Sequence, residues 1–211
     1  ASCTGVFVDT NDTIYCSMRD LHQVVKQSLT NSSSTPVTVA GTGTGGLAPN
    51  MLDQPYGVFV DSNFKLYVAD CGNHRIQLFE PEQLIGTTLT GTGSTGSLSL
   101  KCPISIMMDA DGDLFIAERG NNRIIRLSPE GYEDVIIGGQ GAGSDPNQLS
   151  GPVNAAFDSY GNIFVADVYN NRIQKFYLAS DSCGMYKNYC MRDQPIIRDH
   201  LYLDYCFRTE Y

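Results

Sequence analysis

The sequence predicts an all-β fold in which a four-stranded unit is repeated four times, as in a β-propeller. Apolar runs separated by polar turns recur at a regular period, a Gly-rich link follows each of the first three units, and no segment has the capped 3.6-residue periodicity of a long helix. An Asp closes the first apolar run of every unit, with spacings of 52, 48 and 49 residues between Asp9, Asp61, Asp109 and Asp158. Units of this size pack radially as propeller blades.

The second unit shows the pattern most clearly, over residues 54–79, QPYGVFVDSNFKLYVADCGNHRIQLF. Apolar runs at 57–60 and 66–69 and an alternating run at 75–79 are separated by polar turns, which predicts three antiparallel strands. A fourth short run at 87–90 precedes the link GTGSTG. One such meander buries too little apolar surface to be stable alone, so the copies are expected to stack on one another.

The other units repeat this order. The first has strands expected at residues 5–8, 13–16, 21–25 and 36–40, the third spans 103–127 with a fourth run at 133–137, and the fourth spans 152–176. We place the units at about residues 1–48, 49–97, 98–146 and 147–178.

The segment 179–211 breaks the period and is predicted to be a Cys-containing tail. Its alternating residues Leu201, Leu203, Tyr205 and Phe207 fit either the missing fourth strand of the last unit or a strand donated to a neighbouring molecule.

The repeated pattern P-x-G-[VI]-x-[VF]-D-x-x-x-x-[LI]-[YF]-[VI]-A-[DE]-x-x-N-x-R-I-Q resembles the NHL repeat over roughly residues 1–177. The resemblance implies a β-propeller, commonly of six blades. The four copies therefore predict a four-bladed propeller, or part of a six-bladed ring completed by upstream blades or by another chain.

Composition favours a secreted or secretory-lumen protein. The net charge of −9 disfavours nucleic acid as a partner, and no apolar run approaches the ~20 residues needed to insert into a membrane. Seven cysteines and two N-x-[ST] acceptor sites, at Asn11 and Asn31, favour an oxidising compartment and glycosylation. Without an initiating Met or a signal peptide, we expect a processed chain or an excerpt.

Three acid–Arg pairs are expected to be structural. In each, the acid ends the second strand and the Arg begins the third, so the pair spans one turn: Asp70–Arg75, Glu118–Arg123 and Asp167–Arg172. The first unit has Met18 and Gln23 at these two positions. Losing both charges together is expected of a structural ion pair, because losing one would leave the other buried without a partner.

Two motifs that resemble ligand-binding loops have simpler explanations. The links at 41–46 and 91–96 satisfy G-x-G-x-x-G, but no helix follows to hold a pyrophosphate. The acids Asp109, Asp111 and Asp113 resemble the start of a calcium loop, although Gly120 stands where an EF-hand needs Glu. No cofactor is expected, and this turn is a candidate site for calcium.

The cysteines predict interblade disulfides. Cys71 lies in the turn after the second strand and Cys102 just precedes the next unit, so we expect these two to pair across one face. Cys3 is expected to pair with a tail Cys and close the ring, and Cys183–Cys190 would form a local loop. Seven is odd, so one thiol is free or bonds another chain.

Function is expected on the face that carries the turns between second and third strands, because propellers present binding loops on a rigid scaffold. The candidate residues there are Arg19, Asp20, Asn73, His74, Arg119, Asn121, Asn122, Tyr169, Asn170 and Asn171. We predict a non-enzymatic module that binds protein or glycan.

Two alternatives remain. One is a metal-dependent lyase or hydrolase, because the NHL resemblance includes the lyase that completes peptide amidation. Its candidate ligands are the histidines His22, His74 and His200, but His22 and His74 share a repeat position with Asn122 and Asn171, which favours a turn role. The other alternative is a subunit of an extracellular homo-oligomer or filament.

Overall fold

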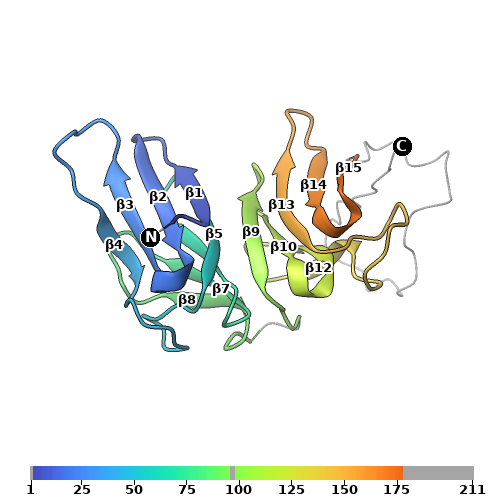
Figure 1. The fold of residues 1–211 in the computed structure, drawn as a ribbon, viewed down its shortest axis with the longest axis horizontal. Coiled ribbons are helices and arrows are strands. Elements are labelled where there is room, and N and C mark those ends of the chain that lie inside the picture. Colours follow the sequence, from blue (N-terminus) through green and yellow to red (C-terminus); the bar gives the residue numbers. More distant parts are fainter. Residues whose placement is uncertain (1, 96–97, 178–211) are drawn as a thin grey trace.

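The structure is a computed structural model that describes residues 2–95 and 98–177. Within this part of the chain the regular elements are β-strands and three short 3-10 turns, in four antiparallel sheets (Figure 1). The predicted tail strand and the Cys183–Cys190 pairing lie outside the described residues. The fold class predicted from the sequence is confirmed: the chain forms β-propeller blades.

Each sheet is built from strands that are consecutive in the sequence. The first sheet contains β1 (Gly5–Val8), β2 (Thr13–Met18), β3 (Gln23–Ser28) and β4 (Val37–Gly41). The second contains β5 (Pro55–Val60), β6 (Leu66–Asp70), β7 (Arg75–Phe79) and β8 (Thr87–Gly91). The third contains β9 (Pro103–Met108), β10 (Leu114–Glu118), β11 (Arg123–Leu127) and β12 (Glu133–Gly138). The fourth has three strands among the described residues, β13 (Pro152–Phe157), β14 (Ile163–Asp167) and β15 (Arg172–Phe176).

The turn between the second and third strands of three sheets contains a 3-10 turn, namely η1 (Arg19–Leu21), η2 (Arg119–Asn121) and η3 (Val168–Asn170). This corrects the third strand expected at residues 21–25. Leu21 belongs to η1 and His22 has a left-handed φ of 50°, so β3 begins at Gln23.

Apolar side chains hold each sheet against the next, and the contacts join β1 to β5, β5 to β9 and β9 to β13. Between the first two sheets the cluster includes Tyr15 and Val24 on one side and Val58 and Phe79 on the other. Similar clusters fill the second and third interfaces. The core formed by the described residues therefore consists of three interblade layers.

The innermost strands approach closely at a glycine. A Cβ atom on Gly57 would lie 2.7 Å from the backbone oxygen of Ile104 in β9, which is closer than Cβ atoms approach in folded proteins. A side chain at Gly57 would therefore push β5 away from β9.

The recurring Asp at the end of each first strand fixes the hairpin that follows. In the second sheet Asp61 Oδ1 accepts hydrogen bonds from the backbone N–H groups of Asn63 and Lys65, both at 2.9 Å. The same pair of bonds recurs at Asp9, Asp109 and Asp158. The Asp repeat seen in the sequence is thus a turn-stabilising device.

Candidate functional site

The turns between second and third strands lie on the same side of the protein as the Gly-rich links. Asn73 donates from Nδ2 to the backbone oxygen of Gly46 at 2.7 Å, and Asn170 donates to Gly143 at the same distance. We call this side the link face; it comprises residues 19–22, 71–74, 119–122 and 168–171 together with the three links. The opposite side, the turn face, carries the β1–β2-type turns and the β3–β4-type loops.

The acid–Arg pair of the second sheet anchors a link to the blade. Arg75 Nε donates to Asp70 Oδ2 at 2.8 Å, and both side chains are buried. The same guanidinium donates to backbone oxygens of the link at Leu47, Ala48 and Met51. Burial raises the pKa of Asp70, opposed by hydrogen bonds from the Asp53 N–H, Asn73 and Arg75.

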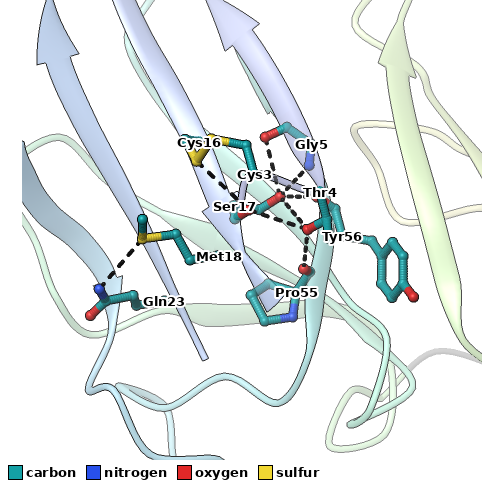
Figure 2. The surroundings of a disulfide bond; sticks show 9 residues. All are labelled: Cys3, Thr4, Gly5, Cys16, Ser17, Met18, Gln23, Pro55 and Tyr56. Carbon is teal, nitrogen blue, oxygen red and sulfur yellow. Dashed lines mark hydrogen bonds between the residues drawn. A yellow bond between two sulfur atoms is a disulfide. The ribbon is translucent and has the colours of Figure 1, made fainter. Parts of the chain in front are cut away.

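The other two predicted pairs are also present. Arg123 Nε lies 2.6 Å from Glu118 Oε2, and Arg172 Nε lies 2.8 Å from Asp167 Oδ2. Burial raises the pKa of Glu118 as it does that of Asp70. In the first sheet, the neutral pair makes the corresponding contact, with Gln23 Nε2 3.7 Å from Met18 Sδ (Figure 2). These acids bond to arginines and backbone, so we assign them a structural role.

The residue just before each third strand links its blade to the next. His22, His74 and Asn122 have left-handed φ values of 50°, 57° and 54°. Their side chains accept hydrogen bonds from backbone N–H groups just before the next inner strand: Gln54 to His22 Nδ1, Cys102 to His74 Nδ1 and Gly151 to Asn122 Oδ1. We call this bond the interblade latch, and it explains why His and Asn both occur at this repeat position.

Three of the other Asn candidates, Asn73, Asn121 and Asn170, are bonded to their own blade and to the neighbouring link. Asn73 Nδ2 also donates to Asp70 and Asn170 Nδ2 to Asp167, while Asn121 Nδ2 bonds to Glu118 and to the Ser99 backbone oxygen. These amides hold the turn and the link together. They are therefore poor candidates for contacts with a partner.

An Arg–Tyr pair with an exposed ring also lies on the link face. Arg119 Nη2 donates to the Tyr169 hydroxyl at 2.7 Å, and the guanidinium lies 5.6 Å from the centre of the Tyr169 ring. Tyr169 is 62% exposed. A pocket of about 430 Å³ on the same face is lined by residues that include Gly120, Asn121, Asn122 and Arg123.

A second Arg–Tyr contact lies at the first interblade boundary. Arg19 donates to Gln54 Oε1 at 3.0 Å and lies 5.5 Å from the centre of the Tyr56 ring. Figure 2 shows the Tyr56 side chain directed away from the Cys3–Cys16 region. Asp20, next in the chain, is exposed.

The structure contains the predicted Cys71–Cys102 disulfide, which joins the second and third blades with a Cα–Cα distance of 4.0 Å. The expected pairing of Cys3 with a tail cysteine is wrong: Cys3 bonds to Cys16 in β2 (Figure 2). The cause is local, because Thr4 N donates to the Ser17 backbone oxygen and so pairs the residues after Cys3 with β2. This disulfide staples the first blade internally.

The calcium candidates do not converge. Asp109 Oδ1 binds the turn backbone, and Asp113 lies 3.5 Å from Arg126. Within residues 2–95 and 98–177 there is no group of three or more His, Cys, Asp or Glu placed to hold a metal ion.

The two glycosylation candidates, Asn11 and Asn31, are exposed on the turn face. Asn11 lies between β1 and β2, and Asn31 lies between β3 and β4.

No helix among the described residues is long and apolar enough to cross a membrane.

The NHL repeat family model matches residues 52–79 and 149–176, the second and fourth units of the predicted repeat. The chain is a β-propeller that contains NHL repeats. No curated protein sequence matches this NHL propeller.

Several solved structures share the fold. Virginiamycin B lyase from Staphylococcus aureus, solved with quinupristin, is 14% identical with a TM-score of 0.60 and covers 82% of this chain and 51% of its own. A chain of a nidogen/laminin complex is 17% identical with a TM-score of 0.63, covering 82% and 59%. An auxiliary nutrient binding protein from Bacteroides thetaiotaomicron is 16% identical with a TM-score of 0.62, covering 82% and 47%.

The NHL propeller described here thus spans about half the length of these structures. Identities below a fifth establish the fold and nothing about activity. The neighbours include a lyase and a protein from a binding complex.

Proposed function

We propose that this NHL propeller is a non-enzymatic extracellular module that binds a protein partner through its link face. The observation that carries the proposal is the exposed Arg119–Tyr169 pair. Tyr and Arg dominate binding energy in protein interfaces, and a Tyr ring already stacked on a guanidinium loses little side-chain freedom when a partner covers it.

Most other polar side chains of the link face are already engaged in bonds within the protein, which leaves fewer residues for a partner. The acids and the arginines of the third strands are bonded to the blade and its link, as are Asn73, Asn121 and Asn170. His22, His74 and Asn122 form latches. The Nδ1 atoms of both described histidines have close protein partners: the Cys102 N–H at His74, and the Gln54 N–H and Asp53 Oδ1 at His22. They are thus occupied by a structural task, which favours binding over catalysis.

The two disulfides and the exposed Asn11 and Asn31 favour an oxidising, secretory environment. If both asparagines carry glycans, the turn face of the first blade is shielded, and the link face is the more accessible side. The similarity to a chain of the nidogen/laminin complex is a precedent for a propeller of this shape that meets a protein partner.

The test compares two exposed tyrosines of the same blade. The wild-type chain, Tyr169→Ala on the link face and Tyr160→Ala on the turn face would be applied to an array of purified extracellular matrix proteins, laminin included, and to a glycan array. Tyr160 is 82% exposed and serves as the matched control. We expect the wild-type chain to bind at least one protein of the array. Tyr169→Ala should weaken this binding at least tenfold, and Tyr160→Ala should leave it unchanged.

Binding to glycans alone would contradict the assignment of a protein partner. Equal loss in both variants would contradict the assignment of the link face. The metal-dependent lyase alternative predicts a stoichiometric metal in the purified protein, which elemental analysis would detect.

A further inference from the structure

The outer sides of the first and fourth described blades expose residues that the three boundaries between described blades bury. One position of the third strand always faces the following blade. Val24, Ile76 and Ile124 occupy it in the first three blades and are 0% exposed, whereas Ile173 in the fourth is 70% exposed. Val168, on η3 of the same blade, is also exposed. We call this side of the fourth blade the trailing face.

The first blade exposes its inner strand on the opposite side, the side that faces a preceding blade in the other three. The position of the inner strand that faces the preceding blade is 6% exposed at Val58, 7% at Ile106 and 9% at Ala155. The equivalent Val6 is 56% exposed, and Val8, two residues along the same strand, is exposed as well. We call this side of the first blade the leading face.

The latch residue of the trailing face, Asn171, does not make the interblade hydrogen bond within the described part of the chain. Asn171 has the left-handed φ of 52° that its counterparts His22, His74 and Asn122 share. Each counterpart accepts a backbone N–H from the following blade. Among the described residues the Asn171 side chain has no hydrogen-bond partner, so it is free to accept the same bond.

We propose that the trailing face of one copy of this chain binds the leading face of a second copy, head to tail. These surfaces are the two sides of an interface that the molecule already forms three times, so each copy carries both complementary halves. A contact of this kind buries Ile173 and Val168 against Val6 and Val8, as the internal boundaries bury their counterparts. The inference goes beyond partner binding at the link face, because it uses different residues.

A second copy fits these faces better than the chain's own segment 178–211. The leading face requires a blade whose third strand presents an apolar residue next to a latch residue, and the sequence of 178–211 lacks the repeat pattern that supplies them. Because the two faces differ, the contact is heterologous, and it generates a ring where the rotation closes and an open series where it does not.

The heterologous geometry allows a stringent test with two variants of the full chain. Val6→Asp/Val8→Asp blocks the leading face, and Ile173→Asp blocks the trailing face. All three residues are exposed, so the variants should keep the circular dichroism spectrum and the unfolding midpoint of the wild type. Tyr160→Asp, an exposed position on the turn face, is the control for added charge.

Sedimentation velocity over a range of concentrations gives the readout. We expect concentration-dependent oligomers for the wild type and Tyr160→Asp, and monomers for each blocked variant alone. An equimolar mixture of the two blocked variants should form a dimer that grows no further, because its single contact uses the two intact faces and both outer faces are blocked.

A wild-type chain that stays monomeric up to its solubility limit would overturn the proposal and show that another segment covers these faces. Blocked variants that still associate, or a mixture that stays monomeric, would overturn it equally.

Discussion

His74 Nδ1 accepts a hydrogen bond of 3.1 Å from the backbone N–H of Cys102, across the boundary between the second and third blades. The Cys71–Cys102 disulfide spans the same boundary. A histidine that is isolated in the linear sequence is thereby explained as one of a series of latches, at positions where other repeats use Asn.

Exchanging the latch residue separates its backbone conformation from its hydrogen bond. We expect His74→Asn to leave the free energy of unfolding nearly unchanged, because Asn tolerates left-handed φ and offers an oxygen acceptor, as Asn122 does. His74→Gly keeps the conformation but loses the bond, at a cost of ~1 kcal/mol. Urea unfolding measures both. A His74→Gly variant as stable as His74→Asn would contradict the latch.

The buried Asp70–Arg75 pair should be strongly coupled. Asp70→Ala leaves the Arg75 guanidinium buried without its carboxylate and should cost ~3–5 kcal/mol of unfolding free energy. The first blade offers a natural replacement, so Asp70→Met with Arg75→Gln should cost less than the sum of the two single changes. A double-mutant cycle by urea unfolding measures this coupling. Strictly additive costs would argue against the pairing.

Two tyrosines should make the protein sensitive to alkaline pH. Burial and the nearby Asp9 carboxylate raise the pKa of Tyr15 to about 12, and burial and Asp61 raise that of Tyr67 to about 12. An unfolded Tyr loses its proton near pH ~10. Between these values the folded state holds more protons than the unfolded state, so stability must fall as the pH rises.

The matched variant is Tyr15→Phe/Tyr67→Phe, since Phe115 and Phe164 occupy the same position in the third and fourth blades. The urea midpoint should fall between neutral pH and pH ~11 in both proteins. The fall should be smaller for this variant than for the wild type, because the variant lacks the two tyrosines. Identical pH profiles would show that these tyrosines titrate normally.

Secretory expression should glycosylate Asn11 and Asn31, which are both exposed on the turn face. We expect the intact mass to fall on treatment with an N-glycosidase. Asn11→Gln and Asn31→Gln should each remove one glycan without lowering the unfolding midpoint. A mass that the glycosidase leaves unchanged would contradict the predicted modification.

The positions of the repeated hairpins and ion pairs could be predicted from the sequence. Of the two disulfides, each of which occurs once, the sequence predicted Cys71–Cys102 but not Cys3–Cys16. The Asp61 hairpin and the Asp70–Arg75 pair recur in register, so comparison of the copies identified their positions and, for Asp70–Arg75, their partners. The Cys3–Cys16 disulfide occurs in one blade and depends on how the residues before β1 pair with β2. The only sequence signal for it was that both cysteines lie in the first unit.

The Arg119–Tyr169 contact was missed for a related reason. Both residues were candidates for the binding face, but they belong to different blades and different positions of the repeat. Their proximity depends on how η2 and η3 sit across a blade boundary, which periodicity does not determine.

The division of the link face between blade-holding and partner-binding residues can be tested most directly at two adjacent positions, Tyr169 and Asn170. Asn170 bonds to the Gly143 backbone oxygen and to Asp167, whereas Tyr169 is largely exposed. The measurement is the urea unfolding free energy of Asn170→Ala and Tyr169→Ala. We predict a loss of ~1–3 kcal/mol for Asn170→Ala and a change within ~0.5 kcal/mol for Tyr169→Ala. A Tyr169→Ala variant that is destabilised as much as Asn170→Ala would contradict the assignment of Tyr169 to partner binding.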